Sequence, residues 1–370
     1  MLSSLRPALR VITGLLLAGM VLEFCARLDD FAVYGAPLWS AYNSEILYKW
    51  DALGKTGKPG ARYKKWQLNS LGFRGPELKP GGIRIVCFGS SETFGLYEAP
   101  NEEFPRQLES DLNARAEGQF FQIVNAAYPG ETLATTALRV PEIVRQVRPQ
   151  VAVIYPSVAA YIFPPPAHVA APPPTARFEL RIVDKSRDLL KQLLPRGVQN
   201  YLREREIRRW AEANGSEARL PEENMRRFAS DLTELITSLR AAGVEPVLVT
   251  HATRFGETIK PGARPWLVAW RRFYPMLQEN GFLDMENRAN DIMRHLGAVE
   301  EVTVIDAAHE IPPGQRNFAD FVHFTSTGAA LMAQDLADGL GPVILARCGG
   351  TCLKVPKNQP RTTLAVSRAN

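Results

Sequence analysis

The fold of this chain is decided by the stretch Ile83-Arg84-Ile85-Val86-Cys87-Phe88-Gly89-Ser90-Ser91-Glu92-Thr93-Phe94-Gly95. Residues 83–88 form a nearly continuous apolar run, which is typical of a central parallel strand buried on both faces. The small residues that follow favour a tight turn, and this turn offers a serine hydroxyl at the end of the strand. The stretch therefore predicts the strand-turn-helix unit from which α/β folds are built.

Apolar and helix-like segments alternate downstream of this unit. Further strands are predicted at residues 121–126, 151–155, 244–250 and 302–305. Helices are predicted at residues 102–115, 132–147 and 221–243, and a closing helix is capped by Ser326 or Thr327. Pro141 is expected to kink or split the second helix. The pattern predicts an α/β/α fold in which a parallel sheet of about five strands carries helices on both faces.

The composition describes an ordinary globular protein. Apolar residues make up 45% of the 370 residues and charged residues 22%, so the chain can bury a sizeable core. The net charge is +5, but the densest basic cluster, at residues 203–209, interleaves Glu204 and Glu206. A solvated helix face explains this cluster, so no nucleic-acid partner is expected. The oligomeric state is left open.

The N-terminus predicts a single membrane-spanning helix. Arg6 and Arg10 precede an apolar run at residues 11–22, which is shorter than the roughly 20 residues that a span needs. Counted from Pro7 to Leu28, with arginines reaching the interfaces, the segment is long enough. Basic residues before it and acidic residues after it place the N-terminus in the cytoplasm. An uncleaved anchor is favoured over a signal peptide, and a buried amphipathic helix of a soluble protein is the alternative.

The composition also suggests how the chain is divided. We expect an anchor at residues 1–28, an extracytoplasmic linker and lead-in at residues 29–80, a main domain at residues 81–345 and an irregular tail at residues 346–370. Residues 157–220 are first rich in proline and then charged and helix-prone, so they predict an insertion over the carboxyl edge of the sheet. Such an insertion could line a site or serve as an arm that binds a partner.

Two cysteines, Cys348 and Cys352, stand close together near the C-terminus. In an oxidising periplasm they could form a disulfide, and two free thiols are the alternative. Their spacing does not match a zinc site without histidine partners nearby. No metal or organic cofactor is expected.

Three polar residues that are distant in the sequence supply the parts of an activated serine. Ser91 offers a hydroxyl in the first turn, and Asp320 and His323 stand three residues apart. An imidazole can remove the hydroxyl proton near neutral pH, and a carboxylate behind it fixes the tautomer. We therefore predict that Ser91 is a nucleophile, His323 a general base and Asp320 the acid that orients it.

The segment from Gly89 to Gly95 resembles the first sequence block of the SGNH (GDSL-like) hydrolase superfamily, and Ser91 falls on its nucleophile position. The run Asp320-Phe321-Val322-His323-Phe324-Thr325, followed by Gly328, resembles the last block, which carries the acid and the base. The resemblance implies a three-layer α/β/α fold and acyl transfer through a Ser-His-Asp triad.

Two further segments carry the same resemblance. The run Asn125-Ala126-Ala127-Tyr128-Pro129-Gly130-Glu131-Thr132 is similar to the second block, whose glycine donates an N–H to the oxyanion hole. That glycine matches Gly130, which would act together with the N–H of Ser91. Residues 69–75 look like the lead-in of membrane-anchored bacterial members, which implies a single-pass inner-membrane protein with its catalytic domain in the periplasm or outside the cell. The resemblance covers residues 69–160 and 221–340.

The sequence departs from the superfamily at the third block, which normally carries an Asn that donates to the oxyanion. Ala159 occupies that position. The loss of one such donor typically costs about 2.7–4 kcal/mol of transition-state stabilisation. Ser157, Tyr155 or His251 could replace the donor, the acceptor chemistry could differ, or the enzyme could be weak or inactive. Taken alone, His251 is interpreted as a loop histidine.

The resemblance implies an esterase that acts on O-acyl esters, notably O-acetyl esters, of a cell-envelope carbohydrate. The first alternative is an O-acyltransferase that modifies an extracytoplasmic polysaccharide. The second is a catalytically weak binding protein of the same fold, which Ala159 suggests. The expected partners are an acylated small-molecule or carbohydrate substrate and, through the N-terminal helix, the membrane.

Overall fold

The structure is a computed structural model that describes residues 2–34, 38–39, 46–51, 53–162, 180–256 and 259–354. At its centre is a five-stranded parallel sheet with the strand order β6-β5-β7-β8-β9. The strands are β5 (Ile83–Gly89), β6 (Phe121–Asn125), β7 (Val151–Tyr155), β8 (Glu245–Val249) and β9 (Thr303–Ile305). The predicted parallel sheet is thus confirmed, with each strand within two residues of its expected position.

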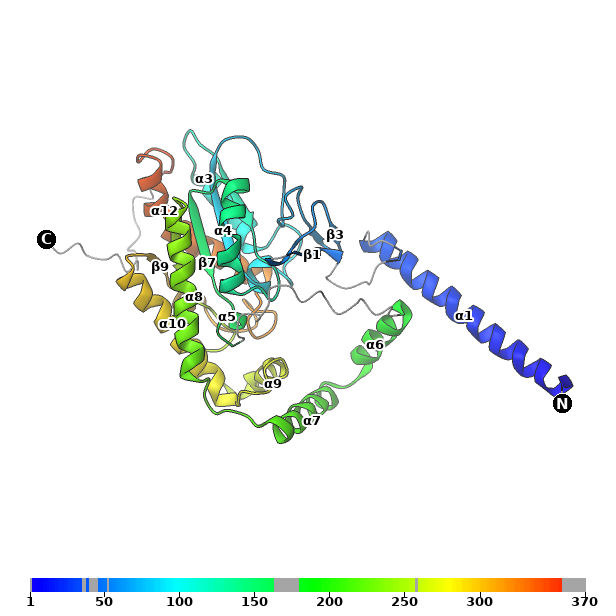
Figure 1. Ribbon diagram of the computed structural model, residues 1–370. Coiled ribbons are helices and arrows are strands. Elements are labelled where there is room, and N and C mark those ends of the chain that lie inside the picture. Colours follow the sequence, from blue (N-terminus) through cyan, green and yellow to red (C-terminus); the bar gives the residue numbers. More distant parts are fainter. Residues whose placement is uncertain are drawn as a thin grey trace.

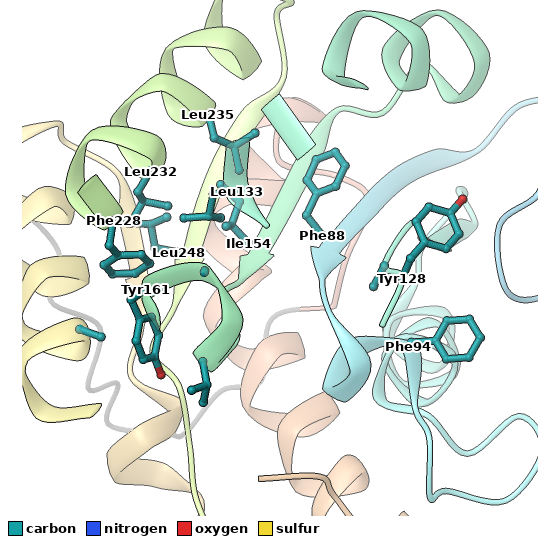
Figure 2. Close-up of a cluster of buried hydrophobic side chains, with 14 of the residues drawn as sticks. Phe88, Phe94, Tyr128, Leu133, Ile154, Tyr161, Phe228, Leu232, Leu235 and Leu248 are labelled. Atoms are coloured by element: carbon teal, nitrogen blue, oxygen red, sulfur yellow. The ribbon is translucent and has the colours of Figure 1, made fainter. Parts of the chain in front are cut away.

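Helices cover both faces of the sheet and form two separate cores. Along β5, Ile85 and Cys87 point into one core and Val86 and Phe88 into the other, as the two-residue period of a strand requires. The first core lies under α3 (Phe104–Arg115) and α12 (Ser326–Arg347); the second lies under α4 (Leu133–Val147), α8 (Glu222–Ala241) and α10 (Glu279–Val299). Figure 2 shows part of the second core, including Phe88, Leu133, Ile154, Phe228, Leu232, Leu235 and Leu248.

Of the two outcomes predicted for Pro141, a kink or a split, the split does not occur, because α4 continues past Pro141 as one helix. The cap of the closing helix differs from its prediction. The closing helix α12 is capped by Thr325, one residue before the predicted cap, because the Thr325 hydroxyl accepts the N–H of Gly328 at 3.1 Å.

A long helix, α1 (Leu2–Tyr34), extends away from the body of the molecule (Figure 1). Its segment Leu9–Val33 is long and apolar enough to cross a membrane and is only 11% buried. The helix α12 passes the same test of length and composition, but its Met332, Leu336 and Leu340 are buried in the core beside α3. Burial therefore separates a core helix from a candidate membrane span.

The segment between α1 and the sheet forms two small antiparallel hairpins. They consist of β1 (Tyr48–Asp51) with β2 (Gly54–Gly57) and of β3 (Arg62–Tyr63) with β4 (Trp66–Gln67). Tyr48, Tyr63 and Leu68 are buried in the second core, so this segment packs against the main body.

The described residues of the predicted insertion form three helices. The short helix α5 (Val158–Ile162) is buried, and α6 (Arg181–Leu193) contacts α1, beside the end of α1 nearer the body (Figure 1). The third, α7 (Arg196–Asn214), contacts α9 (Arg264–Arg271). The charged segment predicted as one helix-prone piece is thus interrupted at Leu194 and Pro195. The proline-rich part, residues 163–179, and the tail from residue 355 lie outside the described residues. Cys348 and Cys352 form a disulfide.

Candidate active site

The turn after β5 places Ser91 at the carboxyl edge of the sheet. Ser91 begins the short helix α2 (Ser91–Phe94), whose turn is closed by hydrogen bonds from Phe94 N to Ser90 O and from Gly95 N to Ser91 O. A Cβ atom on Gly89 would lie 2.1 Å from Thr93 Oγ1 and 2.8 Å from the Tyr155 carbonyl. Only glycine therefore allows the chain to turn this tightly beside β7.

The loop before α12 carries Asp320 and His323 in a fixed arrangement. Asp320 Oδ1 accepts the backbone N–H groups of Val322 at 3.0 Å and His323 at 2.9 Å. Asp320 Oδ2 lies 2.8 Å from His323 Nδ1. Arg254 steadies the loop by donating to the carbonyl of Phe318 at 2.9 Å. The carboxylate thus holds both the backbone and the ring of His323.

The structure brings this loop to Ser91. His323 Nε2 lies 2.9 Å from Ser91 Oγ, although the two residues are 232 positions apart in the sequence. The side chains of Asp320 and His323 are 14% and 13% exposed, so the site is shielded but open to solvent. The three side chains named from the sequence form one continuous hydrogen-bonded row.

Ionisation of this row follows from its geometry. Burial disfavours the Asp320 carboxylate, but hydrogen bonds from the side chain and backbone of His323 outweigh it and hold the pKa of Asp320 below its usual range. Burial likewise disfavours the His323 imidazolium, but the hydrogen bond to Asp320 and the charge of Glu92 outweigh it and raise the pKa of His323. The row therefore stabilises a positive imidazolium, the species that forms when a base takes the serine proton.

Glu92, which the sequence presented only as part of the first motif, is a second partner of Ser91. The Ser91 hydroxyl lies 2.9 Å from Glu92 Oε2, and Glu92 is only 3% exposed. Below it, His251 Nε2 lies 3.6 Å from Glu92 Oε1, and His251 Nδ1 lies 2.7 Å from Glu286 Oε2. Tyr161 completes this buried network by donating to Glu286 Oε1 at 2.7 Å.

His251 is therefore more than the loop histidine that the sequence suggested. It follows β8 and is 1% exposed, with a carboxylate near each ring nitrogen. Burial disfavours its charged form, but the charge and hydrogen bond of Glu286 and the nearby carboxylate of Glu92 outweigh it and raise the pKa of His251. His251 and the charge of His323 in turn lower the pKa of Glu92 against the effect of burial. No sequence signal pointed to this pairing, because its members come from separate elements.

Most of the oxyanion donors considered from the sequence already have other contacts. Gly130 N donates to Ser90 Oγ at 2.8 Å, so its N–H lies beside the Ser91 turn but already has a partner. Ala159 lies in α5 and offers only a methyl group. Tyr155 Oη accepts from Ala252 N at 3.2 Å, and His251 Nδ1 is bound to Glu286.

Ser157 was also named as a replacement for the missing Asn. It is 5% exposed, and its Oγ has no hydrogen-bond partner among the described residues, whereas the free ring nitrogen of His251, Nε2, lies 3.6 Å from the Glu92 carboxylate. Gly89 at the end of β5 is paired with Tyr155 at the end of β7. Ser91 follows Gly89 by two residues and Ser157 follows Tyr155 by two, so both serines lie at the carboxyl edge of the sheet. Within the described part of the chain, no cluster of His, Cys, Asp and Glu is arranged to hold a metal ion.

Neither the family models nor the curated protein sequences match this chain. Several solved structures are similar to it. A lipase/acylhydrolase from Enterococcus faecalis is 16% identical, with a TM-score of 0.41 over 75% of this chain and 100% of its own. A variant of an acetyl-xylooligosaccharide esterase from Geobacillus is 12% identical, with a TM-score of 0.42 over 71% and 97%. A GDSL-like lipase from Bacteroides thetaiotaomicron is 13% identical, with a TM-score of 0.39 over 70% and 88%.

Proposed function

We propose that this chain is an SGNH-type serine esterase that transfers an acyl group through an ester on Ser91. The observation that carries the proposal is the row Ser91–His323–Asp320, with 2.9 Å between Ser91 Oγ and His323 Nε2 and 2.8 Å between His323 Nδ1 and Asp320 Oδ2. A serine at the end of a strand, an imidazole in bonding distance and an ionised carboxylate behind it are the parts that nucleophilic acyl transfer requires.

The proposed reaction proceeds in two halves. His323 Nε2 takes the Ser91 proton while Oγ attacks the carbonyl carbon of the ester, and the carbonyl oxygen becomes an oxyanion. The imidazolium returns the proton to the leaving alcohol as its bond to carbon breaks, which leaves an acyl ester on Ser91. Water then attacks this ester with His323 as base, the acid departs, and the Ser91 hydroxyl is restored.

The oxyanion would be held by the backbone N–H groups of Ser91 and Gly130. Support for Gly130 comes from its position against the Ser91 turn, where its N–H points at Ser90 Oγ. The third donor, absent at Ala159, is assigned to Ser157, whose buried hydroxyl lacks a partner among the described residues. A hydroxyl can rotate toward a developing charge without a backbone movement.

The proposed substrate is an O-acyl ester, such as an O-acetyl group, on a carbohydrate of the cell envelope. The exposed apolar surface of α1 supports a membrane anchor, because these side chains would otherwise face water. The disulfide between Cys348 and Cys352 supports an oxidising compartment outside the cytoplasm. A tethered esterase outside the inner membrane would meet envelope polysaccharides rather than cytoplasmic esters.

The decisive experiment is labelling of the full chain in detergent micelles with a fluorophosphonate, which reacts with activated serines. The wild type should be labelled and Ser91→Ala should not, whereas Ser230→Ala, which changes an exposed serine of α8, should be labelled like the wild type. A folded wild type that resists the probe would refute the proposal and favour a binding protein. Product analysis of an acetylated sugar, with and without a second sugar as acceptor, separates hydrolysis from acyl transfer.

A further inference from the structure

The Ser91 hydroxyl has two acceptors within reach but only one proton to donate. Its oxygen lies 2.9 Å from His323 Nε2 and 2.9 Å from Glu92 Oε2. General-base catalysis requires that this proton points at His323. When it points at Glu92 instead, His323 Nε2 can only donate to Ser91 Oγ, and a donating nitrogen cannot act as a base.

Glu92 is held beneath the nucleophile by buried groups that the proposed mechanism does not use. Glu92, His251, Glu286 and Tyr161 are each at most 4% exposed. A buried carboxylate stays ionised only where a cation or hydrogen bonds compensate for the loss of water. His251 supplies that cation, and Glu286 with Tyr161 fixes its ring from the other side. The network thus maintains a negative charge at Glu92, against the serine.

We infer that Glu92 is a positioning residue that competes with His323 for the Ser91 proton and holds the site in a resting arrangement. The inference rests on the proposed role of Ser91 as nucleophile. In the resting arrangement His323 is protonated and donates to Asp320 from Nδ1 and to Ser91 from Nε2, while the Ser91 hydroxyl donates to Glu92. When His323 releases a proton to water, the Ser91 proton turns to Nε2 and the serine becomes a nucleophile.

The charges around His323 agree with this arrangement. Asp320 acts from its own loop and Glu92 from α2, and together they raise the pKa of His323 against the effect of burial. Within the part of the chain that the structure describes, the other titratable or charged groups that face this loop are Tyr97, Glu98 and Arg254. Among the carboxylates that raise the pKa of His323, Glu92 is distinguished by also contacting the Ser91 hydroxyl.

The test follows the His323 ring by NMR in the full chain, with ¹⁵N-labelled histidine, in detergent micelles as the pH is varied. In the wild type the titration midpoint should lie above about 6.5, the ordinary value for histidine. Glu92→Gln keeps the shape of the side chain but removes its charge, and should lower the midpoint by about one pH unit or more. Glu245→Gln is the matched control, because Glu245 begins β8 at the opposite edge of the sheet.

Fluorophosphonate labelling gives a second readout. Below the wild-type midpoint, Glu92→Gln should be labelled about tenfold faster than the wild type, in proportion to a shift of one pH unit. A wild-type midpoint at or below about 6.5 would overturn the inference. So would an unchanged or raised midpoint in Glu92→Gln, or a folded variant that is unlabelled at every pH.

The two proposals fail separately. The histidine titration needs no turnover, so an unlabelled wild type would remove the proposed function while the titration still decides whether Glu92 controls His323. If Glu92→Gln does not fold, a wild-type midpoint at or below about 6.5 still overturns the inference.

Discussion

The backbone N–H of Gly130 donates a 2.8 Å hydrogen bond to Ser90 Oγ, and this bond joins the loop after β6 to the turn that carries Ser91. Ser90 is 2% exposed, and Gly130 has a φ of 81°, which glycine adopts without strain. The bond therefore fixes an intrinsically flexible residue at the place from which its N–H would stabilise an oxyanion.

Removing this bond should impair catalysis more than binding. We expect Ser90→Ala to lower kcat by about fivefold with little change in KM, because one hydrogen bond contributes about 1 kcal/mol. Hydrolysis of 4-nitrophenyl acetate measures both constants, and denaturant unfolding checks that the variant is folded. An increase in kcat would mean the opposite, namely that Ser90 withholds the Gly130 N–H from the oxyanion.

Ser157 should account for the third oxyanion donor. We expect Ser157→Ala to lower kcat by about 10²-fold at unchanged KM, the low end of what the loss of one donor costs in other acyl-transfer enzymes. Ser230→Ala serves as the control for the loss of a hydroxyl elsewhere. A Ser157→Ala variant with the rate of the wild type would leave the two backbone N–H groups as the whole oxyanion hole.

The pH dependence of kcat/KM should report the protonation of His323. The base must be neutral to accept the serine proton, so activity is lost as the pH falls through the pKa of His323. Because Asp320 and Glu92 raise that pKa against burial, the midpoint should lie above about 6.5. A rate that stays constant across neutral pH would remove His323 from the role of base.

Asp320→Asn tests the other end of the row. The amide oxygen can still accept the backbone N–H groups of Val322 and His323, so the loop should keep its shape. The charge that supports the imidazolium is lost, and we expect kcat to fall by about 10⁴-fold, as in triads of this kind. A loss of less than tenfold would show that Glu92 alone stabilises the imidazolium.

The sheet could be predicted from the sequence because its strands are buried on both faces. Residues 83–88 and 151–155 are apolar at nearly every position, and each continues into a turn residue that marks its end. The row Ser91–His323–Asp320 could be named because its residues sit in short motifs at the ends of elements. The hairpins β1 to β4 could not be predicted from the sequence, because their strands have only two to four residues each and lack an alternating apolar pattern.

The buried network under Ser91 was missed for a different reason. Glu92 belongs to α2, His251 follows β8, and Glu286 lies on α10, so only the folded structure brings them together. A buried glutamate looks like a surface glutamate in a sequence, because burial depends on what packs over it. Glu286 stands between apolar neighbours of α10 at helical spacing, Phe282 and Ala289, and that is the one signal of its burial.

The contact between α1 and α6 holds part of the insertion beside the candidate membrane span. Asp30 is fully buried and pairs with Arg181, while Lys185 lies 3.1 Å from its second oxygen. Glu23 Oε2 accepts the backbone N–H of Ile182 at 2.9 Å and so satisfies the start of α6. Removing one partner of a buried ion pair costs about 3–5 kcal/mol, which is enough to release a short helix.

Asp30→Ala should therefore free α6 from α1 without unfolding the main domain. We expect trypsin to cleave the variant within residues 180–214 several-fold faster than the wild type in detergent micelles, with fluorophosphonate labelling of Ser91 retained. Asp29→Ala is the control, because Asp29 is 58% exposed and its pairing with Lys185 is screened by water. Equal cleavage rates for Asp30→Ala and the wild type would mean that the apolar packing of α6, rather than its ion pairs, holds it to α1.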